Sequence, residues 1–238
     1  MLKIMQRLIR NVRSKAYRIL LKPIMKIFMG SHHDLVKFPP NYIYFDRFNE
    51  DSIVLDVGCG NTAEFSLHFI DKYNLKAYGV DPTRKHAPYL KILEDKTKGK
   101  FCHINAAITA KEGFVEFYES KHHESGSTIS NHYTIQTYEM SSYRVESINL
   151  DELIRRIGAK DIDILKLDIE GAEYDLLKNI TDQKLMPFKQ LFIEFHFHCT
   201  NHTFLETILL VRKICKYGYK VATLDYKNYL FYNKVSHP

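Results

Sequence analysis

The chain is short of cysteine, glycine and proline. Its 238 residues include four cysteines, 10 glycines and 7 prolines, and no two cysteines form a C-x-x-C pair. This pattern argues against a disulfide-stapled module and predicts free thiols in the reducing cytoplasm. Few glycines and prolines, with no low-complexity tract, argue against long disordered linkers. The length suffices for one sizeable hydrophobic core.

Long apolar runs are absent from the N-terminal region. Residues 1–30 carry eight of the 34 basic residues and none of the 28 acidic ones, so the remainder has a net charge of −2. Charges interrupt the segment too often for a transmembrane span or for the apolar core of a signal peptide. A nearly neutral body gives little support to nucleic-acid binding.

Apolar residues such as Ile4, Leu8 and Val12 recur in this basic segment at roughly helical spacing. We therefore predict a basic helical arm over residues 1–40, followed by one domain over residues 41–238. Three interpretations of residues 1–30 stay open: a helix packed on the domain, an amphipathic helix at an anionic membrane surface, or an organelle transit peptide. The second would make a cytoplasmic protein peripheral to the membrane.

From residue 50 onward, short apolar runs alternate with amphipathic ones, which predicts βαβ units around a parallel sheet. The last two predicted strands are separated by about two residues, so they must be antiparallel neighbours. The expected fold is an α/β, Rossmann-like class I methyltransferase fold, with a mostly parallel seven-stranded sheet and an antiparallel C-terminal hairpin. The predicted strands of this sheet are 52–58, 76–81, 101–108, 163–171, 190–198, 219–225 and 228–233, and the predicted helices 62–73, 83–96, 151–158, 172–180 and 203–217.

A glycine turn follows the first of these strands. LDVGCG places Asp56, Gly58 and Gly60 between a strand and a helix, where glycines allow close approach to a ligand. The third glycine of a dinucleotide fingerprint is missing, which favours a smaller adenosyl ligand without phosphates. Asp81 ends the next strand and can accept both ribose hydroxyl hydrogens, while Asn105 and Ala106 end the third strand near the adenine edge.

Several segments, in order, resemble the FkbM family of S-adenosylmethionine-dependent methyltransferases: LDVGCGNTAEFS, GVDPTRKH, FCHINAAI, SGSTIS, VESINLDELI, DILKLDIEGAEYDLLK and LFIEFH. The resemblance covers residues 50–198 and implies S-adenosylmethionine as cofactor. It departs from the family after Gly60, where this chain is one residue longer before Glu64. The cofactor-binding residues we expect are Asp56, Gly58, Cys59, Gly60, Asn61, Asp81, Pro82, Asn105 and Ala106.

Charged residues alternate along the strand predicted over 163–171. Lys166, Asp168 and Glu170 would share one face, and Glu194, His196 and His198 would do the same on the next strand. A pair such as Lys166 with Glu194 could offset the cost of burial. We predict that Asp168 and His196 lie closest to the acceptor, because methyl transfer to a hydroxyl benefits from proton removal and imidazole has a suitable intrinsic pKa near 6.5.

The predicted catalytic set is therefore Asp168, His196, Lys166, Glu170 and Glu194. A purely structural charge network is one alternative, and Glu170 could instead cap the following helix. A divalent ion held among Asp168, Glu170, His196, His198 and His202 is another, but spacing does not define a ligand set, so we assign no metal. The polar loop 121–134, with Ser127, Thr128 and Ser130, is a candidate cover for the acceptor.

The resemblance implies O-methylation of a sugar, a glycan or a related small molecule. Two alternatives remain. One is an RNA 2′-O-methyltransferase, which the basic arm favours and the neutral body opposes. The other is a non-catalytic cofactor-binding module of a glycan-assembly complex. The expected partner is a small-molecule or glycan acceptor, with nucleic acid unexpected and membrane contact confined to residues 1–30. The sequence does not indicate an oligomeric state.

Overall fold

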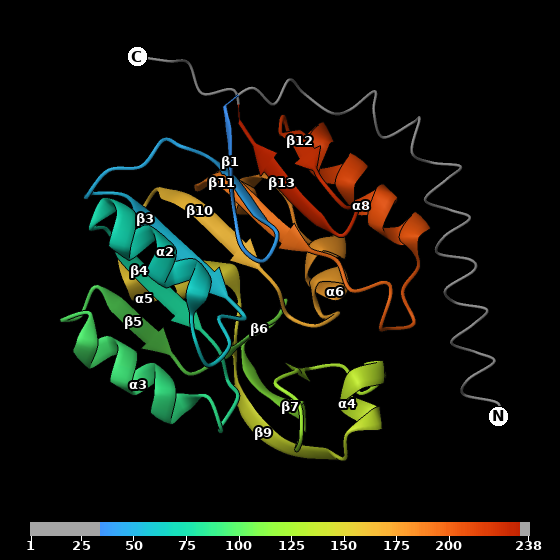
Figure 1. Cartoon of the computed structure of the whole chain (residues 1–238). Coiled ribbons are helices and arrows are strands. Elements are labelled where there is room, and N and C mark those ends of the chain that lie inside the picture. The colour runs from blue at the N-terminus through green and yellow to red at the C-terminus, as the bar shows by residue number, and fades with distance from the viewer. Residues whose placement is uncertain (1–33, 234–238) are drawn as a thin grey trace.

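The structure is a computed structural model, and it describes residues 34–233. A seven-stranded sheet forms its centre, with β13 as the antiparallel strand between β11 and β12 (Figure 1). The predicted fold class is thereby confirmed. In spatial order the strands are β12 (Lys220–Thr223), β13 (Asn228–Tyr232), β11 (Phe188–Glu194), β10 (Ile162–Leu167), β3 (Ile53–Val57), β4 (Lys76–Val80) and β5 (Phe101–Ile104).

Helices cover both faces of this sheet, as a parallel sheet requires. One face packs side chains such as Leu165 and Val57 against α5, α6 and α8, and the other packs Ile164 and Val54 against α2 and α3. Alternate residues of β10 and β3 thus enter two separate cores. The helices are α2 (Glu64–Tyr73), α3 (Ala87–Lys96), α5 (Leu150–Ile157), α6 (Glu173–Lys178), the short α7 (Asp182–Leu185) and α8 (Phe204–Lys216).

An aromatic hairpin adds to the second core. It consists of β1 (Leu35–Phe38) and β2 (Tyr42–Phe45), and the fully buried Tyr44 hydrogen-bonds His68 and Tyr73 of α2. The prediction of a helical arm to residue 40 is wrong over residues 35–38, where β-branched and aromatic side chains form a strand instead. Residues 1–33 of the predicted arm lie outside the described residues. Among residues 34–233, no helix is long and apolar enough to cross a membrane.

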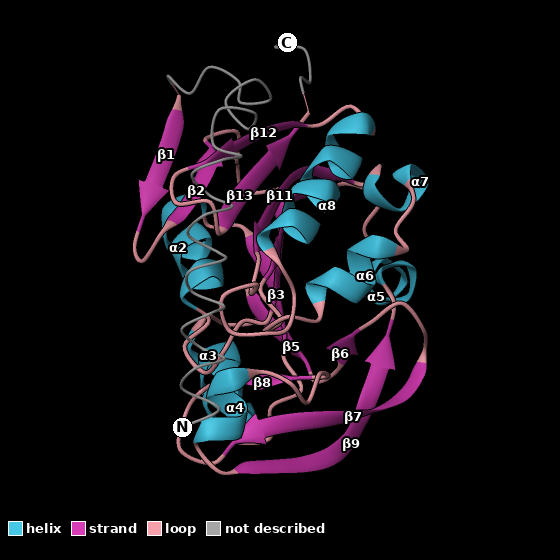
Figure 2. Ribbon diagram, turned by 90° about the vertical axis from the view of Figure 1, so that its right-hand side faces the viewer, coloured by secondary structure: helices cyan, strands magenta, loops and turns pink. Residues whose placement is uncertain are grey.

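An inserted four-stranded sheet lies beyond the carboxyl ends of the parallel strands (Figures 1 and 2). The antiparallel pairing of its two long strands and its assembly as a separate sheet were not predicted from the sequence. Its own hydrophobic cluster is small and is centred on Ala107, Phe117 and Val145, while Ile108 and Ile148 join it to one core of the main sheet. Its elements are β6 (Ala107–Ile108), β7 (Gly113–Ser120), β8 (Gly126–Ser127), β9 (Met140–Ile148) and the helix α4 (Tyr133–Thr137).

The two predicted strands that carry the candidate catalytic residues end earlier than expected. Strand β10 stops at Leu167 and β11 stops at Glu194, and their last paired residues are Leu167 and Ile193. The chain then turns, with Glu170 at φ 53° and Gly171 at φ 101°. Asp168, Glu170 and His196 therefore sit on loops at the strand ends. Their predicted alternation along strands is wrong, although the loops still bring them together.

A buried lysine ties the centre of the sheet together. Lys166 of β10 is 2% exposed, and its Nζ lies 3.0 Å from Asp56 Oδ1 of β3 and 3.3 Å from Asp168 Oδ2. Burial alone would lower the pKa of Lys166, but Asp56 and Asp168 raise it well above its ordinary value, so the amine stays charged. The predicted pairing of Lys166 with Glu194 is wrong, because Asp56 is its neighbour in register on the adjacent strand.

We expect Lys166→Met to lower the free energy of unfolding by about 3–5 kcal/mol, because Asp56 would keep a buried charge without its partner. Urea denaturation of the full chain measures this change. Lys184→Met is the matched control, since it removes an exposed ion pair with Asp151 (2.9 Å) and should cost less than about 1 kcal/mol. Equal losses of unfolding free energy in the two variants would show that the buried ion pair stabilises the fold no more than the exposed one.

Candidate active site

A cavity opens where the central parallel strands end. Its floor is the glycine turn after β3, its side is the segment after β4, and its roof comes from the inserted sheet, including Phe117 and residues 123–128. Asp168, Ile169 and Glu170 close the side next to β10. Ligands of open α/β sheets bind at this position, outside the carboxyl ends of the strands. We call it the donor cavity.

Two glycines shape the floor of the donor cavity. Gly58 has φ 77°, and a Cβ there would lie 1.7 Å from the carbonyl oxygen of Asp168, so the close packing of the turn on β10 requires glycine. Gly60 has φ 65°, and a Cβ there would meet no atom within 4 Å. Because Gly60 lines the cavity, its bare backbone leaves this space to a ligand.

Asp81, directly after β4, is the buried acid of the donor cavity. It accepts hydrogen bonds from the backbone amides of Gly60 (3.0 Å) and Thr83 (2.8 Å). His86 lies between two carboxylates, with Nδ1 3.3 Å from Asp81 and Nε2 2.7 Å from Glu124. Burial alone would raise the pKa of Asp81, but its bonds to His86 and Thr83 lower it, so Asp81 is a fixed carboxylate facing the cavity.

The structure divides the predicted cofactor residues into two groups. Gly58, Gly60, Asp81, Pro82 and Ala106 line the donor cavity. The other four, whose contact with a cofactor stays a prediction, lie outside the lining: Asp56, Cys59, Asn61 and Asn105.

The reasons for this division differ between residues. Asp56 is fully buried and accepts hydrogen bonds from the amide (3.2 Å) and hydroxyl (2.9 Å) of Ser66, so it anchors α2 from behind the turn. Cys59 is buried in the core on the same side as α2, whereas Asn105 is exposed. Ala106 is buried and lines the cavity in place of the Asn105 amide.

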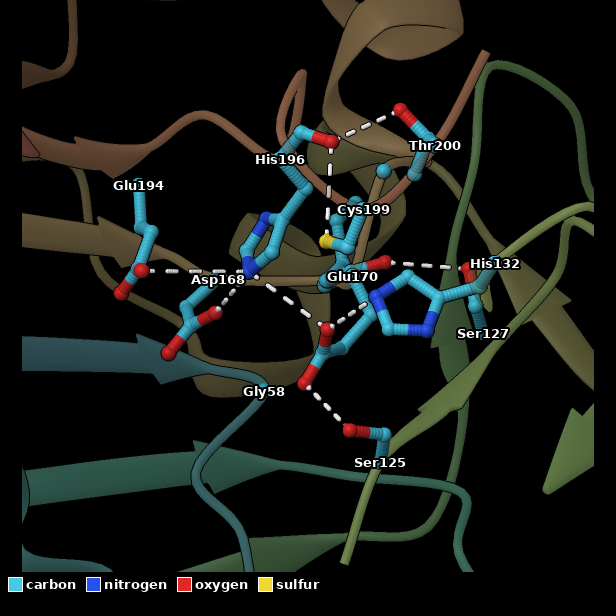
Figure 3. Close-up of polar contacts among 12 residues, drawn as sticks. Gly58, Ser125, Ser127, His132, Asp168, Glu170, Glu194, His196, Cys199 and Thr200 are labelled. Carbon is cyan, nitrogen blue, oxygen red and sulfur yellow. Dashed lines mark hydrogen bonds and ion pairs between the residues drawn. The ribbon is translucent and has the colours of Figure 1, made fainter. Parts of the chain in front are cut away.

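Next to the donor cavity, carboxylates surround the imidazole of His196 (Figure 3). Its Nε2 lies 3.5 Å from Asp168 Oδ1, 3.5 Å from Glu170 Oε2 and 4.0 Å from Glu194 Oε1. We call Asp168, Glu170, Glu194 and His196 the acidic cluster. Four of the five predicted catalytic residues thus come together, and the fifth, Lys166, reaches the cluster through Asp168.

Glu173, at the start of α6, holds the histidine of the cluster in place. It is fully buried, and its Oε1 accepts the backbone N–H of His196 at 2.8 Å and lies 3.1 Å from the ring Nδ1. Its Oε2 accepts the amide of Gly171 at 2.8 Å. A carboxylate on Nδ1 fixes the orientation of the ring and directs Nε2 toward the cluster.

Glu170 is held by the inserted segment. Its Oε1 accepts the hydroxyl of Ser125 at 3.0 Å, and its Oε2 lies 2.8 Å from His132 Nε2. The left-handed backbone of Glu170 is costly for a residue with a Cβ and persists only where its surroundings fix it. Burial alone would raise the pKa of Glu170, but His196 and His132 lower it to about 2. Its side chain thus bonds the inserted segment rather than capping α6.

The pKa values of the other three members of the cluster are raised instead of lowered. Burial and the neighbouring Asp168 raise the pKa of Glu194 to about 7, and burial also raises the pKa of Asp168. Burial alone would lower the pKa of His196, but Glu173 and Glu170 raise it well above its ordinary value. The intrinsic value near 6.5 used in the sequence prediction therefore does not hold in this environment.

A second, larger cavity of about 810 Å³ adjoins the cluster. Glu170, Ser125 and His123 line both cavities, so the two share a wall. The second cavity is rich in amide and hydroxyl side chains from α4 and the loop after β11, and we call it the acceptor cavity. These side chains are Asn131, Thr134, Gln136, Thr137 and Asn201.

The sequence analysis missed Glu173, His132, Ser125 and His86. A signal existed for Glu173, which ends the EGAE motif, and for His132 and Ser125, which lie in the loop singled out over 121–134. Ser127 and Thr128 of that loop line the donor cavity. His202, a candidate ligand only under the metal alternative, stacks on Tyr174 with 3.9 Å between ring centroids and lines neither cavity.

The fold and the donor cavity together define a class. The strand order β5-β4-β3-β10-β11-β13-β12 with an antiparallel β13 is the class I methyltransferase arrangement. Bare glycine backbone, a fixed acid at the end of β4 and the apolar Val80, Ala106 and Ile108 suit the ribose and adenine of an adenosyl ligand. The chain is a class I methyltransferase that uses S-adenosylmethionine.

Comparison with known proteins places the chain in a family. The model of the methyltransferase FkbM domain matches residues 23–221, so the chain belongs to the FkbM methyltransferase family. This confirms the resemblance noted in the sequence. No curated protein matches the chain.

Among solved structures, TrmK from M. capricolum in complex with S-adenosylhomocysteine has a TM-score of 0.40 and 13% identity, and the match covers 78% of this chain and 62% of TrmK. Precorrin-6Y C5,15-methyltransferase from Geobacter metallireducens GS-15 has a TM-score of 0.43 and 13% identity, with 79% and 83% covered.

We expect His86→Leu to weaken binding of S-adenosylhomocysteine about tenfold, because Asp81 would lose the side chain that orients its carboxylate. Calorimetric titration of the purified chain measures the affinity. His122→Leu is the control, since His122 is exposed and contacts only Glu139, at 3.5 Å, among charged neighbours in the described chain. An unchanged affinity in His86→Leu would mean that His86 does not orient the Asp81 carboxylate for cofactor binding.

Proposed function

We propose that this methyltransferase transfers a methyl group to a hydroxyl of a sugar, a glycan or a related polar small molecule. The observation that carries the proposal is the shared wall between the donor and acceptor cavities, with the acidic cluster at their junction. S-adenosylmethionine supplies the electrophilic methyl carbon when it is bound. Everything else that the reaction needs comes from side chains at the junction.

The acceptor cavity supports a polyhydroxylated ligand. Side-chain amides offer both donors and acceptors, and threonine hydroxyls can do either, so together they can match several hydroxyl groups of a sugar. The volume of about 810 Å³ lies in the range of small-molecule sites and leaves room for more than one sugar ring. An extended nucleic acid would require a basic groove, and the lining instead includes Glu170 and Glu194.

The acidic cluster supports deprotonation of an acceptor hydroxyl. A hydroxyl at the junction lies within reach of Asp168, which lines the donor cavity, and of His196, which lines the acceptor cavity. Asp168 accepts the hydroxyl proton as the oxygen attacks the methyl carbon and S-adenosylhomocysteine leaves, whereas His196, whose raised pKa keeps its ring protonated, orients the hydroxyl. Glu173 acts as a positioning residue, because it holds the imidazole of His196 without facing either cavity.

The four cysteines form no disulfide, which supports a reducing compartment such as the cytoplasm. Membrane contact through residues 1–30 stays a prediction, since these residues lie outside the described part of the chain.

The test uses S-adenosylmethionine with a radiolabelled methyl group and the full chain. Monosaccharides, nucleotide sugars, oligosaccharides and an RNA transcript serve as candidate acceptors. We expect label in a sugar fraction as a base-stable ether. His196→Ala should lower this transfer by about 10²-fold or more and leave the affinity for S-adenosylhomocysteine unchanged. Glu116→Gln, at an exposed position on β7, should retain full transfer.

Two results would contradict the proposal. Label in RNA alone would identify an RNA 2′-O-methyltransferase. Donor binding without transfer to any hydroxyl would identify a non-catalytic cofactor-binding module. Full transfer by His196→Ala would keep the activity but remove His196 from the chemistry.

A further inference from the structure

Three ligand-type atoms of the acidic cluster converge on one point. The imidazole of His196 and one carboxylate oxygen each of Asp168 and Glu194 lie within 4.8 Å of one another. Neighbouring ligand atoms around an octahedral cation at about 2.0–2.1 Å are separated by about 3 Å. Small rotations of the side chains would therefore bring all three onto one ion.

The Nε2 atom of His196 points into this space without a close partner. His196 is 4% exposed, and the three carboxylate oxygens nearest to Nε2 lie at 3.5, 3.5 and 4.0 Å, beyond ordinary hydrogen-bond length. Its other nitrogen, Nδ1, is 3.1 Å from the buried Glu173. Histidines that bind metals almost always donate their second ring N–H to such a group.

The cluster also carries more negative than positive charge. The carboxylates of Asp168, Glu170, Glu173 and Glu194 lie around the imidazole of His196, and the imidazole of His132 contacts only Glu170 among them. The nearest lysine, Lys166, is shared with the buried carboxylate of Asp56. Buried carboxylates are costly unless they are paired or coordinate a metal. A divalent cation would offset this excess.

We propose that Asp168, Glu194 and His196 bind a divalent first-row transition ion at the junction of the two cavities. One imidazole with two carboxylates and no thiolate suits Mn²⁺ among these ions, because carboxylates and water are its usual ligands. Resting on the proposed function, the ion would orient the acceptor, because Glu194 and His196 line the acceptor cavity and a cation held there could take hydroxyl oxygens of a sugar.

A second group of possible ligands is less suitable. His132, Glu170 and Cys199 are also close together. However, His132 Nε2 already lies 2.8 Å from Glu170 Oε2, and the thiol of Cys199 donates to the carbonyl oxygen of His196 at 3.6 Å. The carboxylate of Glu170 also accepts the hydroxyl of Ser125 at 3.0 Å, so two of the three residues in this group have other bonds to keep. The ion therefore belongs on the side of Asp168 and Glu194.

The test titrates MnCl₂ into chelator-treated full-length protein saturated with S-adenosylhomocysteine, and follows free Mn²⁺ by electron paramagnetic resonance. We expect one site per chain. Glu194→Gln should weaken Mn²⁺ binding at least tenfold with the affinity for S-adenosylhomocysteine unchanged. Glu173→Gln should weaken it about 10–100-fold, as loss of a carboxylate behind a ligating histidine does. Glu116→Gln should bind Mn²⁺ like the original chain.

No Mn²⁺ site in protein that binds S-adenosylhomocysteine would overturn the inference, as would equal Mn²⁺ affinity in Glu194→Gln and Glu116→Gln. Transfer to a sugar at an unchanged rate after EDTA treatment would also overturn it, while leaving the proposed function intact. Mn²⁺ bound in the expected way without transfer to any hydroxyl would support the metal site and contradict the proposed function. The two proposals can therefore fail separately.

Discussion

The ion pair between Lys166 and Asp56 is the interaction on which both halves of the site depend. The ammonium group of Lys166 lies between the carboxylate of Asp56 on β3 and that of Asp168 after β10. It also donates to the carbonyl oxygen of Gly58 at 2.8 Å. The glycine turn of the donor cavity and the first member of the acidic cluster are therefore fixed to the same atom. A charge buried in this way is tolerated because each of its neighbours is a polar acceptor.

Much of the fold could be predicted because it follows from local pattern. The glycines at 58 and 60 and the acid at 81 each have a direct physical meaning in the chain, and each lies where expected. The last two strands are antiparallel neighbours as predicted, although residues 224–227 join them instead of two residues. Asp56 shows the limit of this reasoning. Its place in the motif suggested contact with the cofactor, whereas its burial beside Lys166 and Ser66 depends on β10 and α2.

The members of the acidic cluster were predicted by a partly incorrect route. Alternation along a strand placed Asp168 and Glu170 on one face, but β10 ends at Leu167. A turn with two left-handed residues brings the side chains together instead. Where a strand stops depends on its neighbours, which a single sequence does not reveal. Glu173 and His132 were missed for the same reason, because their partners are remote in sequence or on another element.

The inserted sheet has a consequence for the exchange of ligands. It roofs both cavities, and its own cluster of Ala107, Phe117 and Val145 is small, although Ile108 and Ile148 join it to one core of the main sheet. Segments with few apolar contacts open at lower free energy than the rest of a protein. Opening here would release Ser125 and His132 from Glu170 and expose both cavities together. Donor and acceptor would then share one route of entry, and the product would leave by the same opening.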